Sequence, residues 1–367
     1  MSKFRLLSAL LSVAILSLAG CGKKEGEPSP DSGGGPPTGK APTVVYVTNG
    51  IARFWNIAHA GVVQAGKDLG IAVEFRAPQS GADDQKRILE DLLTRGVEGI
   101  AVSPIDPDNQ HSLLNDVAKR SILITHDSDA PATNRKFYVG IDNYKAGREA
   151  GKLVKEAIPD GGKIAVFVGR LEQLNARQRR QGLIDEVLDR PMQTLENLKV
   201  DPNDGPIGND KYTFVNTYID QFDSAKVSAQ PEDALAKHTD LDCMVGLFEY
   251  NPPAIINAVQ KAGKLGQVKI VGFDEADETL AAITAGTVQG TVAQQPYEYG
   301  YQSVKILTGL LRKDDKLIPK ETEIMLPPIV VKKEGPDKPE PMNGGPALTV
   351  NAAAFRADVN KKLDSVK

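Results

Sequence analysis

Residues 269–296, KIVGFDEADETLAAITAGTVQGTVAQQP, decide the fold class. The stretch opens with the apolar run 270–273, which is typical of a buried strand in a parallel sheet and stops at Asp274. A helix that ends at Gly286 and a second apolar run, 288–293, follow. This strand–helix–strand pattern predicts an open α/β sheet with parallel strands.

Each apolar run ends at a polar side chain, Asp274 after the first and Gln294 after the second. Open α/β sheets bind ligands at the carboxyl ends of their strands, where the loops of neighbouring strands diverge. We therefore expect Asp274 and Gln294 to hydrogen-bond a polyhydroxylated ligand. The alternative is an ordinary strand–helix–strand unit whose ends are only solvated.

Composition limits the size and the partners of the protein. The chain has 367 residues, of which 41% are hydrophobic and 25% charged. That leaves room for roughly two domains. The formal net charge is -4, and no basic block of the kind that neutralises phosphates is present, so we expect no nucleic-acid partner. The two cysteines, Cys21 and Cys243, cannot support a disulfide framework, and Cys243 is expected to be a buried thiol.

Residues 1–20 have the layout of an export signal peptide. Lys3 and Arg5 precede the apolar run 6–18, which is too short to span a membrane comfortably. The ending Leu18-Ala19-Gly20-Cys21 resembles a bacterial lipoprotein box, which implies lipid attachment at Cys21 and a membrane-anchored protein of the cell envelope, periplasmic or extracytoplasmic. The Gly- and Pro-rich segment 21–42 is expected to be a flexible tether.

From residue 43 onward, strands and helices alternate in two series. The first set of predicted strands comprises residues 44–47, 72–75, 99–102, 122–125 and 138–141, and the second comprises 163–168, 213–216, 243–247, 270–273 and 289–293. The fold class is therefore α/β, with two doubly wound parallel sheets in tandem. The Pro- and Gly-rich segment 190–211 is expected to be a surface insertion, and the tail 336–367 an accessory that packs on the surface.

An ordered set of short segments carries a family resemblance. They are Val47-Thr48-Asn49, Phe54-Trp55, Leu69-Gly70, Ser103-Pro104, Ile124-Thr125-His126-Asp127, Ile141-Asp142-Asn143, Asn175-Ala176-Arg177 with Gly182, Val271-Gly272-Phe273-Asp274 and Ala293-Gln294. In this order they resemble the ribose-type periplasmic sugar-binding proteins of ABC importers, over about residues 43–331. Sugar-responsive repressors share the ligand-binding fold, but this chain begins with an export signal rather than a DNA-binding module.

The resemblance implies the type I periplasmic binding protein fold, with two Rossmann-like lobes joined by a three-strand hinge. The expected first lobe is 43–141 plus 295–325, and the second is 142–294 plus 326–335. A monosaccharide or related polyol would bind between the lobes and be delivered by a monomeric protein to an ABC permease in the membrane. The alternatives are a sugar sensor that docks to a membrane signalling partner and, least favoured, a sugar-acting enzyme.

The resemblance also implies the ligand-binding residues. Phe54 and Trp55 correspond to aromatics that cover the sugar ring, Asp127 and Asp274 to carboxylates that accept bonds from hydroxyls, and Arg177 to a cation of the second lobe. Arg179 and Arg180 are expected on other faces of the same helix. Core packing for the aromatics and helix capping for the aspartates are the alternatives.

Other positions depart from the pattern or match it loosely. Phe222 corresponds to a further ring-contacting aromatic, and Gln294 to a residue at a crossing between the lobes. Ser128 stands where the family has an arginine, and Glu249-Tyr250-Asn251 stand in place of an Asn-Asp pair, so one cation is lost and one carboxylate is gained. These changes make ribose itself doubtful as the ligand.

No cofactor, metal or catalytic residue is expected. The chain lacks a Gly-x-Ser-x-Gly elbow, a His-Glu-x-x-His motif and a phosphate-binding loop. The acidic stretch after Asp201 has its glycine one position early for an EF-hand, so it is only a weak calcium candidate. His126 is expected to be a structural group rather than a ligand contact.

Overall fold

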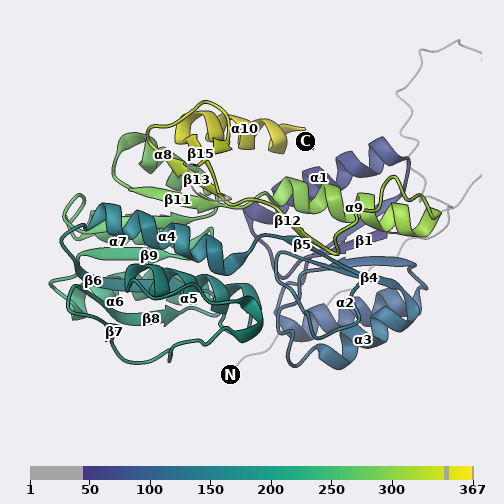
Figure 1. Cartoon of the computed structure of the whole chain (residues 1–367), viewed down its shortest axis with the longest axis horizontal. Helices are drawn as coiled ribbons and strands as arrows, with labels where there is room; N and C mark the ends of the chain where they lie inside the picture. Colours follow the sequence, from purple (N-terminus) through teal and green to yellow (C-terminus); the bar gives the residue numbers. More distant parts are fainter. Residues whose placement is uncertain (1–43, 343–346, 366–367) are drawn as a thin grey trace, which may run out of the picture. The chain divides into compact units, whose positions relative to one another are not determined.

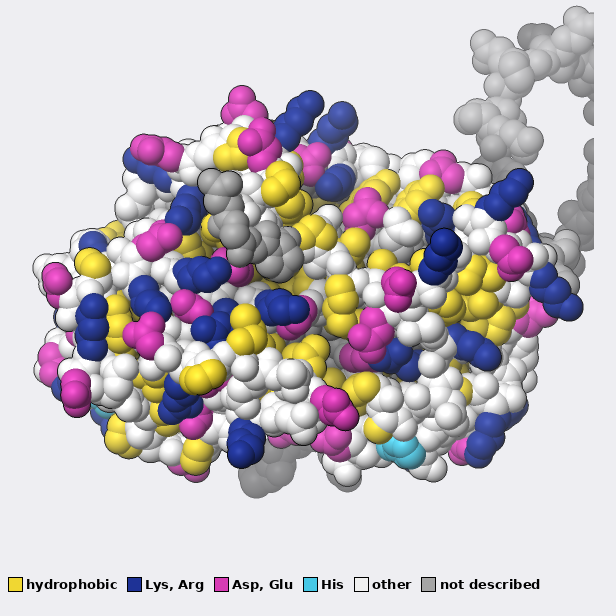
Figure 2. All heavy atoms as spheres, in the orientation of Figure 1, with side chains coloured by type: hydrophobic (Ala, Val, Ile, Leu, Met, Phe, Trp, Pro, Cys, Tyr) yellow, Lys and Arg dark blue, Asp and Glu magenta, His cyan; other side chains and the backbone are white. Residues whose placement is uncertain are grey.

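The strands form two sheets, and the computed structural model describes residues 44–342 and 347–365 (Figure 1). The predicted signal peptide 1–20, the lipid-attachment residue Cys21 and the tether 21–42 lie outside the described residues. No helix of the described ranges is both long enough and apolar enough to cross a membrane. On the face drawn in Figure 2, basic and acidic side chains are intermingled.

The first sheet has six parallel strands in the order β12-β5-β4-β3-β1-β2. Its strands are β1 (Val44–Val47), β2 (Val73–Arg76), β3 (Gly99–Val102), β4 (Ile122–His126), β5 (Phe137–Gly140) and β12 (Glu323–Met325), and its helices are α1 (Arg53–Leu69), α2 (Ala82–Thr94), α3 (His111–Arg120) and α9 (Pro296–Arg312). Alternate residues of β1 join different core clusters, Val44 and Tyr46 in one and Val45 and Val47 in the other. Helices therefore cover both faces of the sheet, as a continuously apolar strand requires.

The second sheet has nine strands in the order β14-β15-β13-β11-β10-β9-β6-β8-β7. Its strands are β6 (Gly162–Val168), β7 (Ile207–Gly208), β8 (Tyr212–Ile219), β9 (Cys243–Gly246), β10 (Lys269–Phe273), β11 (Gly290–Ala293), β13 (Ile329–Lys332), β14 (Glu340–Pro341) and β15 (Leu348–Asn351). The helices around it are α4 (Asn143–Ala157), α5 (Leu174–Val187), the 3-10 turn η1 (Leu195–Asn197), α6 (Ser224–Lys237), α7 (Asn251–Lys261), α8 (Asp277–Ala285) and α10 (Ala352–Asp364).

The parallel parts of the two sheets repeat one topology. In chain order, the second strand of each set lies at one side of the first, and the third, fourth and fifth follow on the other side: β2-β1-β3-β4-β5 and β8-β6-β9-β10-β11. The prediction of two doubly wound sheets in tandem is therefore confirmed. The sixth strands differ, because β12 is parallel to β5 whereas β13 is antiparallel to β11.

The chain passes between the sheets three times. It leaves β5 for α4 at residues 141–142, returns from β11 to α9 at residues 294–295, and leaves β12 for β13 at residues 326–328. Two of these crossings lead directly into a helix. These three segments are where a change of angle between the sheets would be absorbed.

Each sheet carries a closely packed helix pair, α1 with α9 and α4 with α5. A Cβ on Gly61 of α1 would lie 1.9 Å from the carbonyl oxygen of Tyr297, and a Cβ on Gly182 of α5 would lie 2.0 Å from that of Tyr144. Only glycine allows the backbones to approach this closely. These contacts fix the two helices, α1 and α5, that carry side chains of the candidate site.

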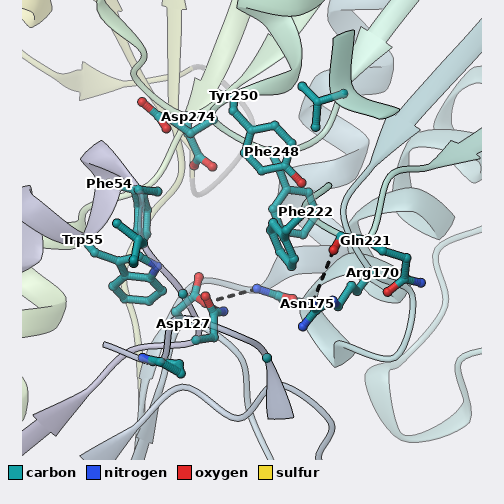
Figure 3. Close-up of a pocket in the computed structure, with 18 of the residues that line it drawn as sticks. Phe54, Trp55, Asp127, Arg170, Asn175, Gln221, Phe222, Phe248, Tyr250 and Asp274 are labelled. Carbon is teal, nitrogen blue, oxygen red and sulfur yellow. Dashed lines mark hydrogen bonds between the residues drawn. The ribbon is translucent and has the colours of Figure 1, made fainter. Parts of the chain in front are cut away.

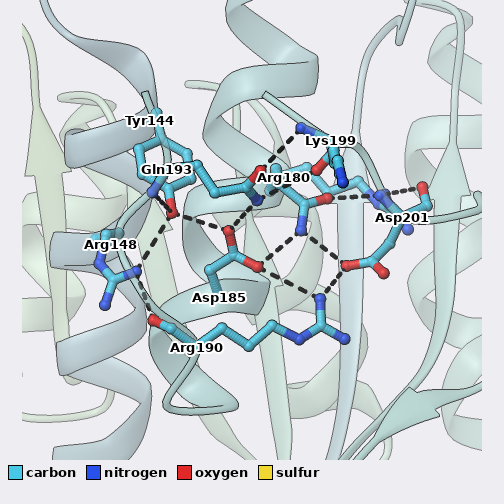
Figure 4. Close-up of polar contacts among 9 residues, drawn as sticks. Tyr144, Arg148, Arg180, Asp185, Arg190, Gln193, Lys199 and Asp201 are labelled. Atoms are coloured by element: carbon cyan, nitrogen blue, oxygen red, sulfur yellow. Dashed lines mark hydrogen bonds and ion pairs between the residues drawn. The ribbon is translucent and has the colours of Figure 1, made fainter. Parts of the chain in front are cut away.

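A buried polar network anchors segment 190–211 (Figure 4). Asp185, only 1% exposed, accepts hydrogen bonds from Tyr144, Gln181 and Gln193 and pairs with Arg190. The Asp201 carboxylate, considered above for calcium, accepts from Arg190 and Gln181 instead. Because each carboxylate has several donors, the insertion is held on α5 despite its Pro- and Gly-rich sequence.

The tail is part of the second sheet rather than a surface addition, so the expectation of a surface accessory is wrong. Strand β15 pairs in parallel with β13, and Phe355 and Val359 of α10 are buried in the core beside that sheet. Helix α10 also reaches α1, where Arg53 donates to the Asn360 side chain at 2.7 Å. The apolar periodicity of 351–363 identified the helix, but the partner strand β13 is too irregular in sequence, with Pro327 and Pro328 before it, to reveal the pairing.

Candidate ligand-binding site

A cavity of about 600 Å³ opens at the carboxyl ends of strands from both sheets (Figure 3). Its volume lies within the usual range of small-molecule sites. The residues that line it include Phe54, Trp55, Asp127, Arg170, Asn175, Arg179, Gln221, Phe222, Phe248, Glu249, Tyr250, Asp274 and Gln294. Asp274 and Gln294, which follow two strands of residues 269–296, therefore line a cavity, as expected for the carboxyl ends of strands in an open α/β sheet.

Asp127 closes β4 and is 4% exposed. Its Oδ2 accepts hydrogen bonds from Ser103 at 2.9 Å, Asn49 at 3.2 Å and Asn175 at 3.3 Å. The bond from Asn175 spans the cavity, because Asn175 belongs to α5 of the second sheet. Burial raises the pKa of the Asp127 carboxyl, while Arg179 and these donors oppose the rise.

Asp274 closes β10 and is 3% exposed. Its Oδ1 accepts from Gln294 at 2.8 Å, and its Oδ2 lies 3.9 Å from the Arg179 guanidinium. Gln294 in turn accepts from the Tyr299 hydroxyl at 3.0 Å, so the amide is fixed from both sides. Gln294 lines the cavity and orients Asp274, which links the crossing at 294–295 to the candidate site.

Both aspartates have left-handed backbone, with φ of 57° for Asp127 and 64° for Asp274. This conformation is uncommon for residues other than glycine and concentrates at functional sites. The turn at each aspartate, here called a corner, is held in the same way. The backbone amide of Asp127 donates to the carbonyl of Val139 of β5, and the backbone amide of Asp274 donates to the carbonyl of Val292 of β11. The repeated topology thus delivers two matching carboxylates to one cavity.

Arg179, not Arg177, lines the cavity from α5. The Arg179 guanidinium is buried, donates to the Asn143 side chain and the Leu247 carbonyl, and lies 4.0 Å from the centre of the Phe273 ring. Arg177 lies outside this lining, where it donates to the Leu171 and Glu172 carbonyls and pairs with Asp108 at 3.2 Å. The expectation that Arg179 faces elsewhere is wrong.

The register of α5 explains this outcome. Residues 177 and 179 point in directions about 200° apart on a helix, so only one of them can face the cleft. Because the α4–α5 contact at Gly182 sets the rotation of the helix, Arg179 is the one that faces inward. Arg180 is buried against Thr217 and the carbonyls of the insertion, as expected for another face.

Aromatic side chains form two opposing walls of the cavity (Figure 3). Phe54 and Trp55, each 5% exposed, form one wall, with ring centres 4.8 Å apart and edge to face. Phe222, Phe248 and Tyr250 form the other, with ring contacts of 5.6–6.1 Å among them. Such walls suit the apolar faces of a flat, hydroxylated ring.

The loop 249–251 divides its side chains between the cavity and the scaffold. Glu249 and Tyr250 line the cavity, whereas Asn251 lies outside the lining. Asn251 accepts from the Phe248 amide and donates to Asp220, and Tyr250 also donates to Asp220. Asp220, 1% exposed at the end of β8, therefore positions the second aromatic wall.

The second-sheet corner holds several acids close together. Burial, then the nearby charge of Asp274, raises the pKa of Glu249 to about 7. Burial also raises the pKa of Asp274, which Arg179 partly opposes, and raises that of Glu275 well above its usual range. Both carboxylate oxygens of Glu275 are buried without a hydrogen-bond partner among the described residues, so its neutral form is favoured.

Two residues considered above have structural roles. His126 lies on Tyr46, with ring centres 3.9 Å apart, and its ring nitrogens bond the Tyr46 hydroxyl and the Val47 carbonyl. Burial lowers the pKa of His126 to about 3. Cys243 is a buried free thiol. Within the described residues, no three His, Cys, Asp or Glu side chains are grouped to hold a metal ion.

Reasoning from sequence missed Asn175, Asp220 and Phe248. Asp220 follows an apolar run just as Asp127 and Asp274 do, so the strand-end rule could have found it. Asn175 belongs to the segment Asn175-Ala176-Arg177 that carries part of the family resemblance, but nothing in its own sequence surroundings shows that it reaches across to Asp127.

Comparison with known proteins supports the same architecture. Residues 43–315 match the family described as the periplasmic binding protein domain. The D-allose-binding periplasmic protein of Escherichia coli is 24% identical over 277 residues, covering 72% of this chain and 83% of that protein. The ribose import binding protein RbsB of Bacillus subtilis is 22% identical over 253 residues, covering 68% of this chain and 75% of that protein.

A solved structure agrees with these sequence matches. An ABC transporter solute-binding protein from Agrobacterium vitis with bound D-fucose has 26% identity and a TM-score of 0.69, covering 79% of this chain and 95% of that one. The predicted resemblance and the type I fold are therefore confirmed. The chain belongs to the periplasmic binding protein family, whose members act outside the cytoplasm.

Proposed function

We propose that this chain is the ligand-binding protein of an ABC sugar importer and encloses a monosaccharide or related polyol. The observation that carries the proposal is the convergence of Asp127, Asp274 and Arg179 between two aromatic walls. Relatives named for allose and ribose, and a solved structure named for bound D-fucose, support a sugar as the ligand class.

In this proposal the sugar ring lies between the two walls. Phe54 and Trp55 cover one face of the ring, and Phe222 and Tyr250 cover the other. Carboxylates and a guanidinium at the ends of the cavity bond the hydroxyls, because charge-assisted bonds are about twice as strong as neutral ones and offset the loss of hydration.

Closure of two lobes would enclose the ligand. The lobes are residues 43–141 with 295–325 and residues 142–294 with 326–335, and the three crossings would serve as the hinge. Lipid on Cys21 would hold the protein at the membrane beside its permease, with 21–42 as the tether. The protein would act as a monomer and leave the sugar chemically unchanged.

Fluorescence and thermal stability test the proposal. Trp55 is the only tryptophan of the chain and lines the cavity, so its emission reports on occupancy. One or a few members of a panel of pentoses, hexoses and polyols should change the emission and raise the melting temperature. At a ligand concentration one hundred times Kd, the free energy of unfolding should increase by about 2.7 kcal/mol.

Two variants make the test specific. Asp274→Ala should abolish the response, and Arg177→Ala, whose side chain lies outside the cavity lining, should retain it. A panel that changes neither signal would contradict the proposal. Conversion of a bound sugar during long incubation would favour an enzyme instead.

A further inference from the structure

Two acceptors of the residues that line the cavity have no hydrogen-bond donor among the described residues. Asn175 is 2% exposed, and its Oδ1 has no partner among the described residues. Because its Nδ2 donates to Asp127, the amide orientation is set and the oxygen is the free end. A buried acceptor without a donor costs free energy, so this atom indicates a donor supplied by the ligand.

Glu249 is a second unpaired acceptor. Its carboxylate lines the cavity, and no side chain or amide of the described residues donates a hydrogen bond to it or forms an ion pair with it. Three neighbouring acids, Asp274, Glu275 and Glu278, and one cation, Arg53, act on it through space.

Neither guanidinium group of the cavity forms an ion pair with Glu249 in the described residues. Arg179 uses three of its five N–H groups on Asn143 and Leu247 and faces Asp274 with its charge. Arg170 donates to the Gln221 carbonyl and lies over the Phe222 ring at 4.9 Å. Three carboxylates and two guanidinium groups line the cavity, and among these carboxylates Glu249 is the one that has neither a hydrogen-bond donor nor an ion pair within the described residues.

From the unpaired oxygens of Asn175 and Glu249, and from the excess of carboxylates over guanidinium groups in the lining, we infer that the ligand is a monosaccharide or cyclic polyol carrying a protonated amino group, with Glu249 as its counter-ion. The ammonium group supplies the charge and up to three N–H donors, and the ring hydroxyls bond Asp127 and Asp274. A neutral sugar with hydroxyl in place of the amine supplies no positive charge to favour the ionised form of Glu249, which burial and Asp274 disfavour. The inference rests on the proposed function and narrows its ligand class.

Matched sugars test the inference. Glucose, galactose and mannose are compared with their 2-amino-2-deoxy and N-acetyl forms, by calorimetry and Trp55 emission near neutral pH. For at least one series the amino form should bind about tenfold more tightly than both neutral forms, a difference of ~1.4 kcal/mol, because a hydrogen bond between charged groups is stronger than a neutral one.

Variants of Glu249 show whether its charge is the cause. Glu249→Gln keeps the size of the side chain and should reduce the ratio of the affinity for the amino sugar to that for the neutral sugar toward one. Glu249→Asp should retain part of this preference for the amino sugar. Glu278→Gln removes an exposed carboxylate outside the cavity lining and should leave the preference unchanged. Melting curves of the unliganded variants confirm that each is folded.

The outcomes separate the two claims. Neutral or N-acetyl sugars that bind as tightly as their amino forms overturn the inference and leave the proposed function standing. An amino preference that persists in Glu249→Gln overturns the role of Glu249. If neither neutral nor amino forms bind, and no other sugar or polyol does, the inference and the proposed function both fall.

Discussion

The corners at Asp127 and Asp274 are built by the same topology but neutralised differently. Each follows the fourth strand of its series, has left-handed backbone, and donates its amide to the fifth strand. Asp127 accepts hydrogen bonds from neutral donors and Arg179 acts on it only through space, whereas Asp274 lies 3.9 Å from Arg179 and among other acids. A repeated fold thus fixes where a carboxylate stands, and the neighbouring loops determine its charge environment.

Replacing Arg179 should have the largest effect, because it breaks the second corner. Arg179→Ala leaves buried Asp274 without its cation and Asn143 without its donor. We expect a loss of roughly 3–5 kcal/mol in the free energy of unfolding, measured by urea denaturation, together with loss of ligand binding. A loss below about 1 kcal/mol would show that the folded state tolerates Asp274 without an adjacent cation.

The second largest effect concerns how the free energy of unfolding changes with pH at the Asp274 corner. Because the folded-state pKa of Glu249 is raised to about 7, the folded protein binds more protons than the unfolded chain between the ordinary pKa of Glu and that value. The contribution of Glu249 to the free energy of unfolding of the unliganded protein should therefore fall, by about 2 kcal/mol, as pH rises from about 4.5 to 7, in addition to the contributions of Asp274 and Glu275, whose pKa values are also raised.

Glu249→Gln should flatten this slope, and Glu278→Gln should largely preserve it. Asp274→Asn should also flatten it, since the charge of Asp274 helps to raise the pKa of Glu249. Denaturation curves across the pH range provide the measurement. An unchanged slope in Glu249→Gln would assign the effect to other groups.

A smaller loss of stability is expected from removing the hydrogen bond between Asn175 and Asp127, which connects the two sheets. Asn175→Ala removes the bond to Asp127, whose Oδ2 keeps Asn49 and Ser103 as donors. Stability should fall by about 1 kcal/mol, and ligand affinity should fall as well. Calorimetry and urea denaturation of the same samples separate the two losses. Unchanged affinity would show that the free oxygen of Asn175 does not contact the ligand.

The smallest effect belongs to Arg177, two residues from Arg179. Its partner Asp108 is 73% exposed in the side chain, so the ion pair should contribute less than about 0.5 kcal/mol and weaken with salt. Arg177→Ala measured at low and high salt provides the check. A loss comparable to that of Arg179→Ala would show that Arg177 contributes more to stability than an exposed ion pair does.

The sequence predicted the strand ends well and the helix faces poorly. Apolar runs followed by aspartate locate a sheet edge, because strand direction and edge follow from local pattern. The choice between Arg177 and Arg179 depends on how α5 is rotated, which the contact between distant residues Tyr144 and Gly182 decides. The pairing of β15 with β13 likewise depends on a partner that no local pattern identifies.

The close glycine contacts between helices also couple the crossings between the sheets to helices that carry cavity side chains. Helix α4 starts at one crossing and is pressed against α5, which carries Arg179, while α9 starts at another and is pressed against α1, which carries Trp55. Helix α4 has 15 residues and is therefore about 22 Å long, so a rotation of about 10° at the crossing would displace its far end by about 4 Å. The distance between probes placed at the far ends of α4 and α9 would therefore measure this rotation without altering the cavity.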